Sequence, residues 1–241
     1  MNLRVISYNL WWHKAYKEVD RLAADEGVDL ICLQECYPSG LKQHVGKLRL
    51  AGAERYMHQL PLVHRGKRNK VTGAALQGDV GMALYYNPKH LKLEDITSLP
   101  LTLPWQERNG GRIMQIAHFK VGSQSLLVVN VHLSALLAPN RARRKQLQEI
   151  LQQVEAYRVT TSTIVMGDFN YPIAPKGLRK LMEDEGFAEC GAHKPAPTHI
   201  SRLVKGKFDR IFISSDLREQ DYAILPFGVS DHAPIVATIL V

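Results

Sequence analysis

Carboxylate, amide and imidazole side chains recur in this sequence beside runs of apolar residues. Asn9 ends the segment Val-Ile-Ser-Tyr-Asn, and Glu35 ends Leu-Ile-Cys-Leu-Gln-Glu. Further residues in comparable places are His132, Asp168, Asn170, Asp209, Asp231 and His232. A single Asp or Asn at such a place is commonly a turn former. Their recurrence instead predicts that loops bring them together above one edge of a sheet.

Together these side chains could hydrolyse a phosphoester with the help of Mg²⁺. Because Mg²⁺ takes oxygen ligands and retains several waters, Glu35 is the predicted metal ligand, supported by the neutral oxygen of Asn9. Asp168 is expected to activate or orient the attacking water. If the backbone stays extended, Asn170 lies on the same face as Asp168, and it could bond a phosphate oxygen without adding negative charge.

Two histidines complete the predicted chemistry. His232 could stabilise the pentacoordinate phosphate or transfer a proton, because imidazole titrates near neutral pH. A nearby carboxylate would fix its tautomer and raise its pKa, and Asp209 is the candidate. His132 could make a second phosphate contact. The alternative for a lone histidine beside a strand is a hydrogen-bonded structural role.

Short apolar runs alternate with helix-period segments and predict the elements that position these residues. Strands are expected over 3–9, 29–34, 81–86, 112–121, 125–132, 163–167, 207–213 and 235–240. Helices are expected over 14–26, 40–50, 139–157 and 175–185. Because strands outnumber helices and some neighbours are close enough in sequence to be antiparallel, the predicted class is α/β (α+β), with mixed sheets covered by helices.

The composition is that of a globular chain. Its 241 residues contain no repeat or linker, so a single domain over 1–241 is expected. From the lack of a long apolar run and of a leader-like N-terminal pattern, neither a membrane span nor a secretory leader is expected. Cys32, Cys36 and Cys190 form no Cys-x-x-Cys pair and predict free thiols. These features favour the cytoplasm.

The formal charge of +8 indicates a polyanionic partner, because neutralising phosphates releases condensed counterions. Basic residues gather at 64–70, 141–145 and 202–210. Arg112, which begins a predicted strand, and Arg143, in the second cluster, are the predicted phosphate contacts. The predicted partner is nucleic acid, with DNA preferred; the alternative is that each cluster is a solvated basic face.

Aromatic residues accompany the predicted site. Trp11 and Trp12 follow Asn9 and could stack on an unpaired base, for about 1–3 kcal/mol per base. They could instead pin the first helix to the sheet. Trp105 and Arg108 could line the same cleft or order a long loop.

The motifs Ser-Tyr-Asn, Leu-Gln-Glu, Val-Asn-Val-His-Leu, Gly-Asp-Phe-Asn, Phe-Asp-Arg-Ile and Ser-Asp-His follow one another through His232. In this order they resemble the endonuclease/exonuclease/phosphatase superfamily, which includes deoxyribonucleases, abasic-site endonucleases, tyrosyl-DNA phosphodiesterases, neutral sphingomyelinases and inositol-polyphosphate 5-phosphatases. The resemblance implies a four-layer sandwich of two mixed β-sheets flanked by helices. It also implies a monomer, and Mg²⁺, with Mn²⁺ as the alternative, as cofactor.

Carried over position by position, the resemblance supports the roles given above and adds Asp231 near the metal. It assigns His132 the phosphate contact made in the deoxyribonuclease and phosphatase branches. In the abasic-site branch a Tyr generally stands near this place, and a Gly-Trp-Arg segment replaces the Val-Lys-Gly-Lys-Phe found here. Both departures argue against abasic-site specificity.

The leading prediction is therefore a divalent-metal-dependent nuclease or DNA-repair-type phosphodiesterase that uses an Asp-activated water. One alternative is a phosphatase or phosphodiesterase for inositol phosphates, sphingomyelin-like or other small phosphoesters. A second alternative is an inactive nucleic-acid-binding homologue, which would usually lack a metal ligand or the base.

Overall fold

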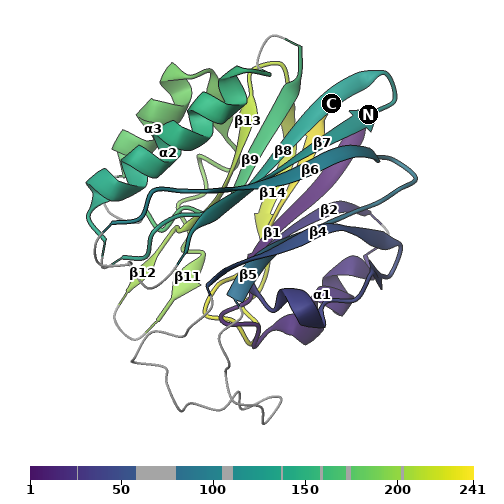
Figure 1. Cartoon of the computed structure of the whole chain (residues 1–241), viewed down its shortest axis with the longest axis horizontal. Helices are drawn as coiled ribbons and strands as arrows, with labels where there is room; N and C mark the ends of the chain where they lie inside the picture. Colours follow the sequence, from purple (N-terminus) through teal and green to yellow (C-terminus); the bar gives the residue numbers. More distant parts are fainter. Residues whose placement is uncertain are drawn as a thin grey trace.

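The computed structural model describes residues 1–25, 27–57, 80–104, 111–136, 138–157, 160–171, 175–201 and 204–241. These ranges contain a seven-stranded sheet, a six-stranded sheet and a two-stranded ribbon (Figure 1). The seven-stranded sheet contains, in spatial order, β14 (Arg218–Ile224), β15 (Ile235–Leu240), β1 (Asn2–Asn9), β2 (Val28–Cys36), β5 (Val80–Tyr86), β4 (Leu48–Met57) and β3 (His44–Val45). The six-stranded sheet contains β10 (Phe187–Glu189), β13 (Asp209–Ser214), β9 (Ser162–Asp168), β8 (Gln124–His132), β7 (Ile113–Val121) and β6 (Lys92–Pro100). The ribbon pairs β11 (His199–Ile200) with β12 (Lys205–Gly206).

Each of the two larger sheets is built around one parallel pair. In the seven-stranded sheet this pair is β1 and β2, and in the six-stranded sheet it is β8 and β9. The neighbouring strands on either side pair antiparallel. Because the carboxyl ends of parallel neighbours lie at the same edge of a sheet, each sheet delivers two strand ends to one edge.

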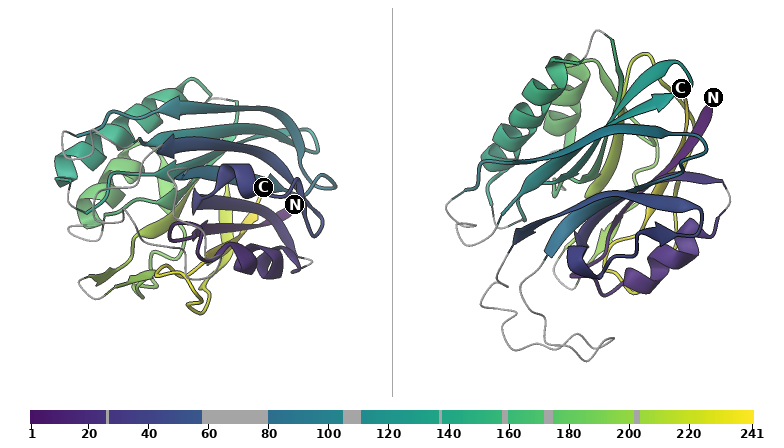
Figure 2. Two further views of the ribbon diagram at one scale, coloured as in Figure 1. Left: turned by 60° about the horizontal axis from the view of Figure 1, so that its bottom comes forward. Right: turned by 45° about the vertical axis from the view of Figure 1, so that its right-hand side comes forward.

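Helices cover the outer faces of the two sheets. Figure 2 shows α2 (Asn140–Glu155) and α3 (Pro175–Asp184) side by side on one outer face and α1 (Tyr16–Ala23) on the opposite side. The buried residues of α2 recur every three or four positions, from Arg143 to Val154, so the helix has one core-facing stripe. The order helix, sheet, sheet, helix confirms the predicted four-layer sandwich of two mixed sheets.

Three hydrophobic clusters separate these layers. The cluster between the sheets includes Leu30 of β2 and Val128 of β8. A second cluster packs α2 and α3 on the six-stranded sheet, and a third packs Val19 and Leu22 of α1 on the seven-stranded sheet. Among the described residues, no helix has the length and apolar character needed to cross a lipid bilayer.

A buried polar network links the two sheets behind the strand ends. Nε2 of Gln34 in β2 donates to Oδ1 of Asn130 in β8 at 2.8 Å. Nδ2 of Asn130 donates in turn to the carbonyl oxygen of Leu33 at 3.1 Å and to Oε1 of Gln115 at 3.0 Å. Polar groups buried in this way must be paired. The Gln of Leu-Gln-Glu and the Asn of Val-Asn-Val-His-Leu therefore fix one sheet against the other.

The predicted helix over 40–50 is wrong. After the short 3₁₀ helix η1 (Pro38–Gly40), the segment forms the hairpin of β3 and β4, in which Val45 pairs with Leu48. Gly46 between them has a φ of +57°, and a Cβ there would lie 2.7 Å from the carbonyl oxygen of Ala23. Because a left-handed glycine closes a two-residue hairpin turn, the turn overrides the helical spacing of the apolar residues.

Other predicted elements differ mainly at their ends. The first helix spans Tyr16–Ala23 and not 14–26, and the strand predicted at 207 begins at Asp209. The strands β6 and β14 were not predicted. Both lie at sheet edges, and their sequences are rich in exposed charged residues. This pattern is typical of edge strands, which use charge to discourage pairing with other chains.

Candidate active site

The predicted site residues meet where the strand ends of the two sheets converge. Asn9 ends β1 and pairs with the residue before Glu35 on β2. His132 ends β8 and lies opposite Asp168 at the end of β9. Asp209 begins β13, pairs with Asp168 and therefore enters at the same edge from the antiparallel side. The topology thus gathers residues that are far apart in the sequence.

Asp168 lies at the centre of this cluster, with only 2% of its side chain exposed. Nδ2 of Asn9 and Nδ2 of Asn170 donate to its Oδ2 at 3.1 and 3.2 Å. The backbone N–H of Asn170 donates to Oδ1 at 2.8 Å. The backbone at Asn170 is not extended as predicted but turns, with a φ of +49°. Nε2 of His132 and Nε2 of His232 lie 3.6 and 3.8 Å from Oδ2. One carboxylate thus organises two amides and two imidazoles.

Gly167 allows Asp168 to reach this position. Its φ is +147°, and a Cβ there would lie 1.9 Å from the carbonyl oxygen of Val131. Only glycine permits β8 and β9 to approach so closely at this point. This is the physical reason for the Gly of Gly-Asp-Phe-Asn, to which sequence reasoning assigned no role.

His232 is oriented by Asp209, whose Oδ2 lies 2.8 Å from its Nδ1. Oγ1 of Thr198 accepts the backbone N–H of Asp209 at 2.9 Å. Oγ of Ser230 accepts the N–H of His232 at 3.1 Å and donates to the carbonyl oxygen of Asn9 at 2.7 Å. Thr198 and Ser230 therefore fix the two partners. Sequence reasoning missed both, although Ser230 opens the Ser-Asp-His motif and that signal could have found it.

Glu35 and Asn9 are held by a turn that contains the two tryptophans. The N–H of Trp12 donates to Oε2 of Glu35, and the N–H of Trp11 donates to Oδ1 of Asn9, both at 2.9 Å. Trp11, Trp12 and Glu35 have φ values of 46°, 57° and 52°. Such values are uncommon for non-glycine residues and cost local strain. The strained turn directs two N–H groups at the predicted metal ligands.

The indole rings of this turn contact protein groups. Trp12 packs against Val80, Met82 and Ile113. Nζ of Lys14 lies 3.1 Å from the centre of the Trp11 ring. Base stacking by these rings stays a prediction. The backbone N–H groups of the two tryptophans position Asn9 and Glu35.

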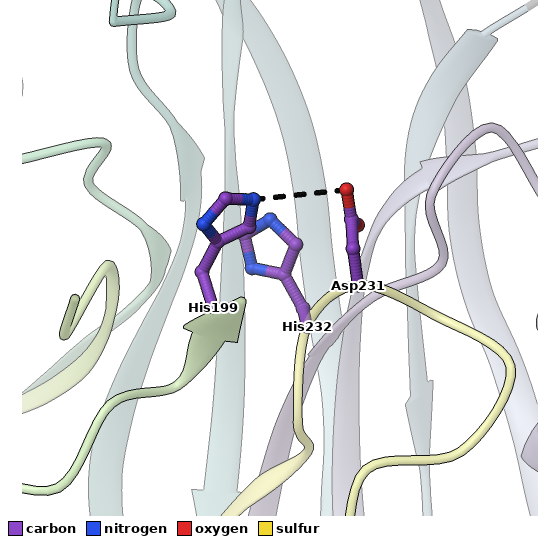
Figure 3. A group of neighbouring side chains, drawn as sticks. All are labelled: His199, Asp231 and His232. Atoms are coloured by element: carbon purple, nitrogen blue, oxygen red, sulfur yellow. Dashed lines mark ion pairs between the residues drawn. The ribbon is translucent and has the colours of Figure 1, made fainter. Parts of the chain in front are cut away.

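His199 belongs to the site and was missed by sequence reasoning. It lies on β11 and forms an isolated backbone bridge with His232. Its Nε2 lies 3.6 Å from Oδ2 of Asp231, as Figure 3 shows. Its ring stacks on Phe208 at a centroid distance of 4.4 Å. His199 follows no apolar run, so the pattern that marked the other residues could not mark it.

The carboxyl groups of the site are buried together, and this shifts their titration. Burial raises the pKa of Glu35, and the neighbouring carboxylates of Asp231 and Asp168 raise it further. Burial likewise raises the pKa of Asp168 to about 6. Their charged forms are therefore destabilised unless a cation neutralises them.

The two histidines respond to their surroundings in opposite directions. Burial holds the pKa of His132 well below its usual value, and the positive charge of Arg112 acts in the same direction. Burial also lowers the pKa of His232, but the carboxylates of Asp209 and Asp168 outweigh burial and raise this pKa to about 10. His232 is thus a stable imidazolium beside a neutral His132.

Glu35, Asp231 and Asn9 offer oxygen ligands of the type that a hard divalent cation prefers, and their role as its ligands stays a prediction. Magnesium prefers carboxylate and carbonyl oxygens and is commonly held by one or two carboxylates. Oδ1 of Asp231 is buried and has no hydrogen-bond partner among the described residues. A cation would satisfy this oxygen and relieve the repulsion between the carboxylates.

The two predicted phosphate-binding arginines lie in different surroundings. Arg112 is 7% exposed and close enough to Glu35 and His132 to lower the pKa of each. Arg143 is 4% exposed, and its Nη1 donates to the carbonyl oxygen of Ala135 at 2.7 Å. Arg112 therefore lies beside the site, whereas Arg143 supports the loop after β8. Phosphate binding stays a prediction for both.

The three basic clusters also differ. In the cluster 202–210, Nζ of Lys207 and Nη1 of Arg210 lie 2.8 and 2.6 Å from Oε1 of Glu189. These two charges are thus paired inside the protein. The partly exposed Arg179 also pairs with Glu189, its Nε lying 2.9 Å from Oε2. In the cluster 141–145, the exposed residues are Arg141, Arg144 and Lys145. The cluster 64–70, Trp105, Arg108 and Arg202 lie outside the described residues.

The sequence matches a known protein family, and the fold is similar to that of several solved structures. The family model described as "Endonuclease/Exonuclease/phosphatase family" matches residues 2–232. Similar solved structures include a mannosyl-6-phosphatase from Bacteroides thetaiotaomicron, with 16% identity, a TM-score of 0.72, and coverage of 99% of this chain and 100% of that one. A humanized D. rerio TDP2 has 17% identity and a TM-score of 0.72, covering 100% and 99%.

ANGEL2, a 2′,3′-cyclic phosphatase, has 12% identity and a TM-score of 0.75, covering 99% of this chain and 95% of that one. A search of curated protein sequences found no significant match. At these identities the structural likenesses show a shared fold, whereas the family model extends over nearly the whole chain.

Proposed function

Because the chain belongs to the endonuclease/exonuclease/phosphatase family, whose members hydrolyse phosphoesters, we propose that it is a divalent-metal-dependent phosphodiesterase that cleaves nucleic acid, with DNA preferred. The observation that carries this proposal is the convergence of Asn9, Asn170, His132 and His232 on the Asp168 carboxylate. A structural ion pair does not need two amides and two imidazoles around one buried acid.

In the proposed reaction, Asp168 orients a water molecule and accepts its proton as the water oxygen attacks phosphorus. The P–O bond to the leaving group breaks, and the leaving oxygen takes a proton from water. Asn9 and Asn170 hold the carboxylate in place through their Nδ2 groups. The pKa of Asp168, raised to about 6 by burial, makes it a stronger base than an exposed aspartate yet leaves it ionised near neutral pH. Its position and its basicity both suit this role.

His232 donates a hydrogen bond to the phosphate oxygen on which negative charge develops. Asp209 accepts from Nδ1 of the ring and thereby directs Nε2 towards Asp168 and the reacting phosphate. His132 stays neutral and offers a second contact. Preorganised donors of this kind stabilise charge without reorganisation.

Glu35, Asp231 and the side-chain oxygen of Asn9 would hold the divalent cation, with Mg²⁺ proposed and Mn²⁺ as the alternative. When bound, the cation supplies Lewis-acid polarisation of the phosphate and neutralises developing charge. The chain's own contribution is to keep these oxygens in place through the N–H groups of Trp11 and Trp12.

Nucleic acid as substrate is supported by the distribution of positive charge. The formal charge is +8, and Arg112 lies beside Glu35. Arg141, Arg144 and Lys145 are exposed at the start of α2, which follows the loop after His132. A charged backbone entering at the strand ends would meet these cations.

A second candidate is a phosphatase or phosphodiesterase for a small phosphoester. It is favoured by the pairing of Lys207 and Arg210 with Glu189, which removes two cations from the face available to a polyanion. The similar fold of a mannosyl-6-phosphatase is compatible with this candidate.

A substrate panel assayed with and without Mg²⁺ distinguishes the two candidates. The panel contains plasmid DNA, single-stranded DNA, RNA, an abasic duplex, a 5′-tyrosyl oligonucleotide, inositol phosphates, a sugar phosphate and sphingomyelin. Asp168→Asn is the blank. If the wild type cleaves a nucleic acid and Asp168→Asn does not, the first candidate is supported. Turnover restricted to the small phosphoesters or lipid would replace it with the second.

A further inference from the structure

His199, Asp231 and His232 form a compact group at the rim of the site. Each offers one ligand atom, and these three atoms lie within 4.8 Å of one another. Figure 3 shows both imidazole rings and the carboxylate directed towards a common region, with the ion pair between His199 and Asp231. Ligands at about 2.1 Å from a tetrahedral ion are themselves about 3.4 Å apart. The 3.6 Å between Nε2 of His199 and Oδ2 of Asp231 is close to this spacing.

The backbone holds these residues in register. The N–H of Ile200 donates to the carbonyl oxygen of Asp231 at 2.9 Å, and the N–H of Ala233 donates to that of Thr198 at 2.7 Å. His199 is further fixed by stacking on Phe208. Small rotations of preformed side chains would therefore bring the three ligand atoms to bonding distance.

The second nitrogen of His232 is arranged as in a metal-binding histidine. Its Nδ1 lies 2.8 Å from Oδ2 of Asp209, which leaves Nε2 as the ligand atom. Zinc would displace the proton that Nε2 carries in the imidazolium, and this proton would pass to solvent. A carboxylate behind a ligating imidazole fixes the tautomer and increases the basicity of the ligand. His199 and His232 are 7% and 6% exposed, whereas 20% of the Asp231 side chain is exposed, so the carboxylate is the member of the group that solvent reaches.

We propose that His199, Asp231 and His232 bind Zn²⁺ in a site distinct in chemistry from the oxygen-only magnesium site. Two imidazoles and one carboxylate suit zinc, whereas magnesium takes oxygen ligands. His199 is the residue that distinguishes this site, because it adds a second imidazole nitrogen beside Asp231 and His232. The site shares Asp231 and His232 with the hydrolytic machinery, so zinc bound there withdraws His232 from the reacting phosphate.

Direct titration of the untagged, chelator-treated full chain with Zn²⁺ tests this proposal. Calorimetry gives the stoichiometry and the Kd, and Co²⁺ used as an optical probe gives d–d absorption bands characteristic of mixed nitrogen and oxygen ligation. The variants are His199→Ala and His199→Phe, of which the second keeps a ring against Phe208. His118→Ala is the matched control, because His118 is an imidazole on β7 that contacts Tyr157.

We expect one zinc per chain in the wild type and in His118→Ala, with a Kd at least tenfold weaker in both His199 variants. The Co²⁺ bands should change in the same two variants. Absence of stoichiometric binding, or an unchanged Kd in a His199→Phe variant that melts like the wild type, would overturn the proposal. These readouts need no turnover, so they stand apart from the test of the proposed hydrolysis.

Discussion

Nδ1 of His232 lies 2.8 Å from Oδ2 of Asp209, and both side chains are buried. The pair joins the start of β13 to the loop before β15, that is, one sheet to the other. Because the buried carboxylate stabilises the charged ring, His232 can remain an imidazolium in a place where burial alone would deprotonate it.

Asp209→Asn should therefore lower the rate of the reaction while leaving substrate binding unchanged. With the carboxylate removed, the pKa of His232 should fall from about 10 towards neutrality, and kcat should fall by about 10²–10⁴-fold. NMR titration of the His232 ring protons measures the first effect, and steady-state kinetics measures the second. An unchanged pKa together with an unchanged kcat would refute the role of Asp209.

Gly167→Ala should destabilise the fold strongly, because its Cβ would lie 1.9 Å from the carbonyl oxygen of Val131. We expect a loss of more than about 3 kcal/mol in the free energy of unfolding. Gly122→Ala is the matched control: Gly122 also has a positive φ, +60°, but a Cβ there meets nothing within 4 Å. That variant should lose only about 1–2 kcal/mol. Urea denaturation measures both, and equal losses would contradict the steric explanation.

Much of the fold and site could be predicted because apolar runs and functional residues alternate along the chain. Asn9, Glu35, His132 and Asp168 each stand at or near the end of a buried strand, and the parallel pairs bring those ends to one edge. The order of the motifs then indicated the four-layer fold. These residues could be located because a polar residue after an apolar run is a local pattern, and it marks the end of a strand in the folded protein.

Other features depend on contacts that no local pattern reports. His199 lies on a two-residue strand, and its partners Asp231 and His232 are remote in sequence. The turn chemistry of Gly46 outweighed an apolar spacing that favoured a helix. Lys207 and Arg210 belong to a run that resembles a surface for polyanions, yet Glu189 pairs with both inside the protein.

Glu189 should make stability depend on pH in acid. Burial disfavours its charged form, but Arg210 and Lys207 outweigh burial and lower its pKa in the folded protein. A carboxyl group with a lowered folded pKa stabilises the protein above its unfolded pKa of about 4.3, and this stabilisation is lost as the pH falls through the folded value. The wild type should therefore lose stability below about pH 4.3.

Glu189→Gln should cost about 3–5 kcal/mol at pH 7, because it leaves buried cations without a counter-charge. The difference from the wild type should shrink in acid, where the wild-type carboxyl group is protonated. Glu94→Gln, at an exposed position of β6, is the control and should stay within about 0.5 kcal/mol. Urea denaturation between pH 3 and pH 7 gives these values; a difference that is constant with pH would exclude the proposed ion pairs as its cause.

Metal-dependent hydrolysis is best tested by the rate of phosphodiester cleavage as a function of Mg²⁺ concentration in the wild type and in Glu35→Gln. Glu35 is the proposed metal ligand, so the variant should be slower by about 10²-fold or more at equal Mg²⁺, with the same melting temperature in the absence of metal. Glu94→Gln should match the wild type. We expect the wild-type rate to saturate with Mg²⁺ and to be lost in chelator and in Glu35→Gln. Hydrolysis that persists in chelator, or that is unchanged in Glu35→Gln, would refute the metal dependence proposed for this site.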